Sequence, residues 1–312
     1  GLLENDKYGN LVPAIAKDWT VSADGLTYTY KLRKGVKWYT SDGEEYAEVT
    51  AKDFVTGLKH AADKKTESIY LAKDSVVGLA DYFNGTDKDF SKVGVKALDD
   101  YTLQYTLKQP EPYWNSKMTY SLFWPVNEEF LKSKGDSFGK STDPSSILYN
   151  GPYILKSLTA KSSIELTKNE NYWDADEVVT KTMNWPISES QSTRLTLVEG
   201  GEADMMVEPP VADQQRLEEA GLLHIGPMLG NYYYVFNVKA DPFTDPEVRK
   251  AFSMVINRAN IVNNIVRGGK EAAYAFVPYG MLESNGREDF REAGNYLVYE
   301  DVEQAKEILK KA

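Results

Sequence analysis

Apolar and polar residues alternate with a period of two along residues 26–33. The apolar positions are Leu26, Tyr28, Tyr30 and Leu32. This alternation predicts a half-buried strand, and the Asp24-Gly25 pair before it is a turn signal. A similar pattern over residues 93–110 predicts a hairpin that turns at Asp99-Asp100.

A helical pattern follows Thr50, which can form a capping box with Asp53. Its apolar positions are Phe54, Val55, Leu58, Ala61 and Ala62. Strands and this helix together predict an α+β domain over residues 1–150. The domain should end near Asn150, where Pro and Gly punctuate the chain.

Beyond Asn150 the pattern changes. Residues 153–169 predict a second hairpin. Helical and extended patterns then alternate, with helices expected at 189–201 and 211–221 and strands expected at 202–207 and 222–226. Such alternation is typical of a parallel or mixed sheet with helical crossovers, so residues 151–230 predict an α/β region.

Three consecutive tyrosines, Tyr232, Tyr233 and Tyr234, lie in a stretch over residues 230–237 that we expect to be a strand. In a strand, Tyr232, Tyr234 and Phe236 would share one face, and Tyr233, Val235 and Asn237 the other. Either the strand is buried between two layers, or one of its faces contacts a ligand. The pattern alone leaves both interpretations open.

The next segment predicts a helix that starts with a capping box from Thr244 to Glu247. We expect its apolar stripe to be buried against a sheet; the stripe consists of Val248, Phe252, Val255 and Ile256. Asn257 can cap a second, shorter helix that Gly268-Gly269 ends. Residues 300–312 predict a further amphipathic helix, with Val302, Ala305, Ile308 and Leu309 on one side.

Composition places limits on function. The chain has 312 residues, of which 42% are hydrophobic, which predicts a multi-domain globular protein. The 36 basic and 47 acidic residues give a net charge of -11, which disfavours nucleic acid and anionic lipid surfaces as partners. No apolar run reaches membrane-spanning length, and we expect no signal peptide within these 312 residues. Gly1 and the uncapped helix at Ala312 lead us to expect a fragment.

Candidate chemistry is sparse. Residues 135–139, GDSFG, match the pattern of a serine-hydrolase nucleophile around Ser137, but the flanking residues predict neither the strand nor the helix that this motif needs. The sequence holds two histidines, His60 on the exposed face of the first helix and His224 in an expected core strand, and no cysteine. We therefore expect no catalytic residue, metal site or cofactor.

Several segments, in order, resemble the family 5 extracellular solute-binding proteins of ABC importers, which include oligopeptide- and dipeptide-binding proteins. They are residues 1–38, 44–61, 150–175, 198–206 and 232–262, with weaker similarity at 269–281 and 300–312. The resemblance therefore extends over nearly the whole chain.

The resemblance implies a mixed α/β protein of the class II periplasmic-binding-protein type, with two lobes and no catalysis. Residues 1–150 would form an accessory α+β domain of the first lobe, 151–230 part of the first α/β lobe, and 231–312 the start of the second lobe. The first strand of the first lobe and much of the second lobe would be missing. A protein of this kind closes over an extended oligopeptide and delivers it to a membrane permease.

The resemblance also suggests which residues contact the ligand. They are Met206, Val207, Glu208, Asn231, Tyr232, Tyr233 and Tyr234. With one lobe incomplete, we expect this chain alone to bind oligopeptides no tighter than about 100 μM.

The expected location is the surface of a bacterium, as a lipoprotein of a Gram-positive cell or in the periplasm of a Gram-negative one. Contact with the membrane would occur only through a lipid anchor outside this chain. Alternatives are the same fold binding an oligosaccharide, a peptide pheromone or nickel, and, in a different class, a serine hydrolase that uses Ser137.

Overall fold

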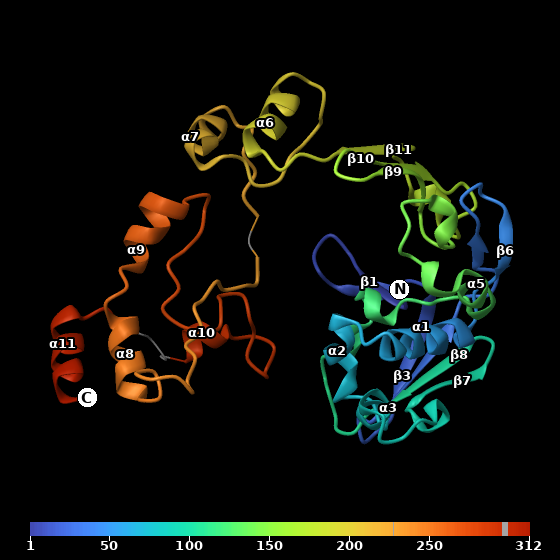
Figure 1. Cartoon of the computed structure of the whole chain (residues 1–312), viewed down its shortest axis with the longest axis horizontal. Coiled ribbons are helices and arrows are strands. Elements are labelled where there is room, and N and C mark those ends of the chain that lie inside the picture. The colour runs from blue at the N-terminus through green and yellow to red at the C-terminus, as the bar shows by residue number, and fades with distance from the viewer. Residues whose placement is uncertain (227, 295–298) are drawn as a thin grey trace. The chain divides into compact units, whose positions relative to one another are not determined.

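The computed structural model describes residues 1–226, 228–294 and 299–312. The chain forms two compact units, Gly1–Ile187 and Ser188–Ala312 (Figure 1). The strands of the first unit are β1 (Leu3–Asn5), β2 (Leu11–Pro13), β3 (Ala16–Val21), β4 (Thr27–Leu32), β5 (Lys37–Tyr39), β6 (Glu45–Glu48), β7 (Val95–Asp99), β8 (Thr102–Thr106), β9 (Tyr153–Thr159), β10 (Ser163–Lys168) and β11 (Thr182–Pro186). Its α-helices are α1 (Ala51–Asp63), α2 (Tyr70–Lys73), α3 (Leu79–Asn84), α4 (Trp114–Lys117) and α5 (Glu128–Lys134).

Four strands of the first unit form an antiparallel sheet in the order β3-β4-β8-β7. On β4, Tyr28, Tyr30 and Leu32 are buried and Lys31 is exposed, as the alternation predicts. The register places Tyr28 opposite Tyr105. The predicted strand over residues 26–33 and the predicted hairpin over 93–110 are therefore both confirmed.

Helix α1 packs against β7 and β8. At its start, the Thr50 backbone N–H donates to the Asp53 carboxylate at 2.9 Å, and Trp38 Nε1 donates to the same oxygen at 3.1 Å. Phe54 and Leu58 lie on the buried face of the helix. The predicted capped helix is confirmed, and the cap also ties β5 to α1.

The second predicted hairpin is also confirmed, as β9 and β10. Strand β11, which the sequence pattern did not predict, adds to the outer side of β10. Two main-chain hydrogen bonds between Tyr39 and Tyr149, 2.7 and 2.9 Å long, link β5 to the chain just before β9. This small sheet is thus attached to the α+β part of the first unit.

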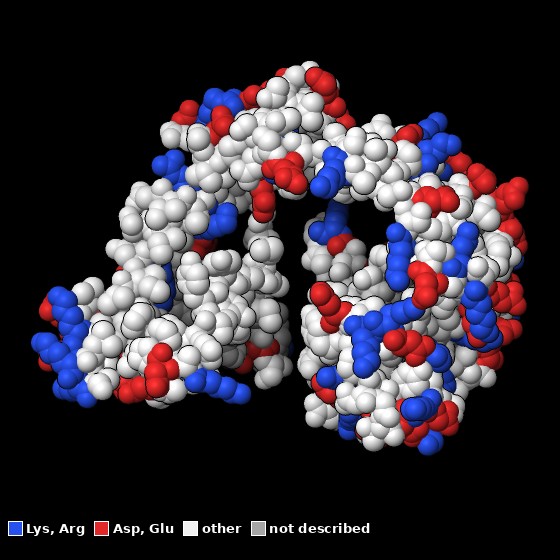
Figure 2. Space-filling model, viewed as in Figure 1, with Lys and Arg blue, Asp and Glu red and all other residues white. Residues whose placement is uncertain are grey.

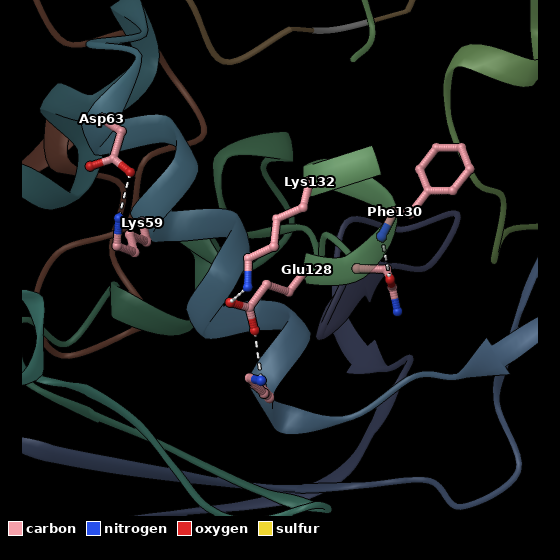
Figure 3. Close-up of polar contacts among 7 residues, drawn as sticks. Lys59, Asp63, Glu128, Phe130 and Lys132 are labelled. Carbon is pink, nitrogen blue, oxygen red and sulfur yellow. Dashed lines mark hydrogen bonds and ion pairs between the residues drawn. The ribbon is translucent and has the colours of Figure 1, made fainter. Parts of the chain in front are cut away.

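Glu128 joins two helices of the first unit through a pair of lysines (Figure 3). Its carboxylate lies 2.6 Å from Lys52 Nζ of α1 and 2.6 Å from Lys132 Nζ of α5. The hydrogen bonds from Lys132 and Lys52 lower the pKa of Glu128 to about 2. Asn127 caps the same helix end by accepting from the Phe130 N–H at 3.0 Å.

Replacement of Glu128 by glutamine should therefore destabilise the protein in a pH-dependent way. The pKa of this carboxyl is lower in the folded state, so its contribution is complete above the ordinary carboxyl pKa and is lost as the pH falls towards about 2. Because the pair is partly exposed, we expect a cost of about 0.5 to 1 kcal/mol at pH 7. Urea melts at pH 7 and pH 2 measure it. Glu129→Gln, in the same helical turn, is the control, and an undiminished cost of Glu128→Gln at pH 2 would contradict the assignment.

The helices of the second unit are α6 (Gln191–Glu199), α7 (Val211–Glu219), α8 (Pro246–Met254), α9 (Arg258–Asn260), a π-helical segment (Ile261–Val266), α10 (Phe290–Ala293) and α11 (Val302–Lys311). The helices expected at 189–201, 211–221 and 300–312 are confirmed, as is the capping of α9 by Asn257. The strands expected at 202–207 and 222–226 are absent, and the described part of this unit has no strand. A strand needs a neighbour to pair its N–H and C=O groups, and the described residues supply none here.

Helix α8 packs on α11 and not on a sheet, which corrects the sequence prediction (Figure 1). Its N-cap is Asp245, one residue later than expected, and its carboxylate accepts from the Glu247 N–H at 2.8 Å. The buried residues are Val248, Ala251 and Met254, whereas Phe252 and Val255 of the predicted stripe are exposed and Ile256 is half-buried. The stripe is rotated because the partner is a single narrow helix, which contributes the fully buried Ala305.

Because of this packing, Met254 should contribute more to stability than Phe252, whereas the predicted stripe implies the opposite. Met254→Ala should cost about 2 to 5 kcal/mol, because it opens a cavity between α8 and α11. Phe252→Ala should cost about 1 kcal/mol or less, since Phe252 is 42% exposed and its ring pairs edge to face with Phe236 and Phe243 outside the contact between α8 and α11. Thermal and urea melts of the two variants provide the comparison. A larger loss of stability for Phe252→Ala than for Met254→Ala would instead support burial of the stripe that the sequence predicts.

Candidate functional site

The tyrosine run lies in an open segment and not in a strand. The exposed fractions of Tyr232, Tyr233 and Tyr234 are 89%, 56% and 78%. The interpretation as a strand buried between two layers is therefore wrong for the described structure. Alternation cannot reveal this, because it reports which side chains share a face and not whether a partner strand exists.

The backbone of this segment is also open. Within the described part of the chain, no main-chain hydrogen bond is made by the N–H or C=O groups of residues 231–236. A segment with free main-chain donors and acceptors can pair with the main chain of a ligand, as in strand addition. The segment can thus offer a peptide both hydrogen-bonding groups and aromatic rings.

A second segment, residues 275–280, lies alongside the start of the tyrosine run. The Asn231 side-chain amide donates to the Ala275 carbonyl at 2.9 Å and also to the Phe276 carbonyl. The rings of Tyr233 and Phe276 meet edge to face with their centroids 5.0 Å apart. Asn231 and Tyr233 are therefore brought together with a residue that the sequence pattern did not single out.

Phe276 was missed because its segment shows no periodic pattern. Residues 269–281 only contributed to the family resemblance, and nothing in them marks Phe276 over Tyr274 or Tyr279. The usable signal was aromatic density outside any predicted helix or strand, which favours either a core or a binding wall. The structure distinguishes a core from a binding wall: Phe276 is 69% exposed, so it does not belong to a core.

The other predicted ligand contacts lie on the loop that leads into α7. Val207 and Glu208 are exposed and Met206 is half-buried. Glu208 has a φ of +54°, a left-handed conformation that is uncommon for a residue with a side chain. Gln214 Nε2 donates to the Pro209 carbonyl at 3.3 Å and attaches the loop to α7. In the described structure, no hydrogen bond or ring contact links this loop to the tyrosine run.

The GDSFG motif does not form a nucleophile site. Ser137 is exposed in a short 3-10 turn (Gly135–Ser137) that follows α5, and its hydroxyl donates to the Lys134 carbonyl at 2.6 Å. A nucleophile elbow instead needs a strand before the serine and a helix after it. The neighbouring Asp136 pairs with Lys64 at 2.8 Å, as a surface ion pair.

The two histidines differ in burial from what the sequence pattern predicts. His60 is half-buried, not exposed as predicted, because its ring packs edge to face on Phe138 at 5.5 Å. Burial lowers the pKa of His60. His224 is exposed and outside any strand, which corrects its placement in a core strand. In the described ranges no three His, Asp or Glu side chains are grouped to hold a metal ion.

Charge is distributed differently over the two units. In Figure 2 the visible face of the first unit carries acidic and basic side chains side by side. The visible face of the second unit has larger uncharged areas, with acidic and basic side chains gathered over α6 and α7 and around α11. Among the described residues, no helix has the length and apolar character to cross a membrane.

A family model described as "Bacterial extracellular solute-binding proteins, family 5 Middle" matches residues 10–312. The chain therefore belongs to the family 5 bacterial extracellular solute-binding proteins, a family defined by binding and not by catalysis. The resemblance seen in the sequence is confirmed.

Several known proteins are similar to this chain. Oligopeptide-binding protein AmiA of Streptococcus pneumoniae is 73% identical over 184 residues, 59% of this chain and 28% of its own length. Oligopeptide-binding protein AliB of the same species is 48% identical over 294 residues, 92% of this chain and 45% of its own length. A solved structure of Listeria monocytogenes OppA bound to peptide has 29% identity and a TM-score of 0.78, over all of this chain and 61% of that one.

These comparisons define the fold at a coarse level. The chain has a mixed α/β fold like that of solved oligopeptide-binding proteins and spans less than half the length of the curated relatives named above. The expected parallel or mixed sheet is not part of the described chain, in which every strand pairing is antiparallel.

Proposed function

We propose that this chain belongs to an oligopeptide-binding protein that captures peptides in an extended conformation for an ABC importer. The observation that carries the proposal is the open backbone of residues 231–236, which presents three exposed tyrosines in a family 5 protein. Free main-chain groups bind any peptide backbone, whereas tyrosine rings give contact area at a low entropic cost. The combination suits peptides of varied sequence.

The proposed organisation follows the family. Residues 1–150 form the accessory α+β domain, residues 151–230 part of the first lobe, and residues 231–312 the start of the second lobe. Met206, Val207 and Glu208 line the ligand from the first lobe, and Asn231–Tyr234 line it at the crossing to the second. The protein acts at the bacterial cell surface, held by a lipid anchor, and its partner is a membrane permease.

Other ligands of the same fold make different demands. An oligosaccharide would use the tyrosine rings but leave the free backbone groups of residues 231–236 without an ordered strand to pair. Nickel prefers imidazole ligands, and His60 and His224 belong to different units. A peptide pheromone would use the same surface as other peptides.

Separate titrations with the three kinds of ligand test the proposal. Isothermal titration calorimetry should show binding of a mixed pool of oligopeptides and not of maltooligosaccharides or Ni²⁺. The double variant Tyr232→Ala/Tyr233→Ala should weaken peptide binding at least about ten-fold, because two exposed rings are lost. Tyr70→Ala removes an exposed tyrosine from the first unit, with an exposed fraction between those of Tyr232 and Tyr233, and should leave peptide binding unchanged. A response to sugar or nickel alone would contradict peptide capture.

A further inference from the structure

We propose that Phe276 and Tyr233 form a subsite that selects an aromatic side chain of the bound peptide, and that Asn231 is the positioning residue that holds the pair together. This inference rests on the proposed function, and it names the kind of peptide that the site prefers. Phe276 contacts the ligand in this account, whereas Asn231 acts through it.

The pair has the geometry of an open aromatic wall. The two rings meet edge to face at 5.0 Å, with an angle of 63° between their planes. Tyr233 is 56% exposed and Phe276 is 69% exposed, so both residues stay accessible to a ligand despite their contact. A third ring can add to such a pair edge to face or in an offset stack.

The loop that carries Phe276 is fixed at several points, so the wall is pre-formed. Besides the hydrogen bonds of Asn231, the Gly280 N–H donates to the Asp289 carboxylate at 2.6 Å. Gly280 has a φ of +93°, and a Cβ atom there would lie 2.7 Å from Leu229 Cδ2, so the two segments approach closely. Leu229 thus lies against Gly280, and Asn231 and Tyr233 lie against residues 275–276. The contact between the two segments therefore involves three alternate residues of the first.

The wall favours an aromatic residue over a charged one because a contact between rings does not require a charge to be desolvated. No lysine or arginine of the described chain lies over the Tyr233 or Phe276 ring, although Arg291 stacks on nearby Tyr279 at 5.3 Å. Residues 188–312 are rich in tyrosine and phenylalanine around this point, with Tyr232 and Tyr234 5.9 Å apart in another edge-to-face pair. A lysine side chain could also sit over these rings, and the experiment separates the two cases.

Three peptides that differ at one position, Phe, Ala or Lys in an otherwise identical sequence, are titrated into the protein. We expect the Phe peptide to bind about ten-fold more tightly than the Ala peptide. Phe276→Ala should reduce this ratio to less than about two-fold, whatever its effect on the affinity for the Ala peptide. Phe276→Leu keeps an apolar side chain without a ring and should give an intermediate ratio. Tyr70→Ala is the control for loss of an exposed ring elsewhere.

Asn231→Asp and Asn231→Gln test the positioning role. Aspartate cannot donate to the two carbonyl groups, so the nuclear Overhauser contacts between the Tyr233 and Phe276 rings should disappear and the Phe/Ala ratio should fall. Glutamine keeps the amide donor, so Asn231→Gln should retain part of the ring contacts and part of the Phe/Ala ratio. A general loss of folding would instead weaken binding of the Ala peptide to the same extent, and circular dichroism would reveal it.

The possible results separate the two proposals. Failure of all three peptides to bind would overturn peptide capture and this subsite together. Equal binding of the Phe and Ala peptides, unaffected by Phe276→Ala, would overturn the subsite and leave peptide capture standing. A preference for the Lys peptide that Phe276→Ala removes would show that the wall binds cations, which also contradicts an aromatic subsite.

Discussion

Replacement of Trp114 by alanine should lower the free energy of unfolding of the first unit by about 3 to 5 kcal/mol. The indole is fully buried and meets the rings of Tyr28, Tyr105 and Phe123 at centroid distances of 6.2, 5.4 and 5.5 Å. These rings come from both central strands of the sheet and from the segment after α4. Alanine would leave a cavity that so many fixed neighbours cannot fill.

Urea melts monitored by far-UV circular dichroism measure this loss. Trp114→Phe should cost less than alanine, because a ring stays in the cluster and Nε1 has no hydrogen-bond partner in the described structure. Trp185→Ala removes an exposed indole from β11 and should lie within about 0.5 kcal/mol of the unaltered protein. A cost below about 1 kcal/mol for Trp114→Ala would mean that this cluster does not form the core.

The second large effect concerns a buried ion pair. Lys117→Met should cost about 3 to 5 kcal/mol, since Glu111 is only 4% exposed and would be left as an uncompensated charge. In the structure Lys117 Nζ lies 2.7 Å from the Glu111 carboxylate and 3.0 Å from Ser75 Oγ. The methionine side chain has a similar volume, so the loss reports charge and not a cavity.

The double variant Glu111→Gln/Lys117→Met shows whether the loss of stability comes from the uncompensated charge of Glu111 or from the loss of the lysine side chain itself. It removes both charges, so it should recover most of the stability that Lys117→Met loses. Lys132→Met breaks an exposed pair with Glu128 and should cost less than about 1 kcal/mol. If the double variant is no more stable than Lys117→Met, the charges of Glu111 and Lys117 do not stabilise each other as their 2.7 Å distance indicates.

The sequence predicted the elements whose signals are local. Strand β4 follows from the alternation of Tyr28 and Tyr30 with threonine, and α1 follows from Thr50, Asp53 and the apolar spacing behind them. Caps and turns are written in neighbouring residues, so they can be identified without knowledge of the rest of the fold. The same holds for the hairpins β7–β8 and β9–β10.

Features that depend on distant partners were not predictable. The stripe on α8 is set by α11, about fifty residues further along the chain, and the strand over 230–237 needs a neighbour that the described residues do not provide. For the candidate site, the tyrosines were visible in the sequence, but Phe276 was not, because its contact with Tyr233 spans 43 positions. A periodic pattern shows which residues share a face and does not show what covers that face.

The most direct test of peptide capture is a residue-by-residue NMR titration of the deuterated, ¹⁵N-labelled protein with an extended oligopeptide. Our account predicts chemical-shift changes centred on residues 206–208, 231–234 and 276, saturating with an affinity no tighter than about 100 μM. Signals of the sheet β3-β4-β8-β7 should not move. Absence of any change at millimolar peptide, or changes confined to the first unit around Ser137, would contradict the account.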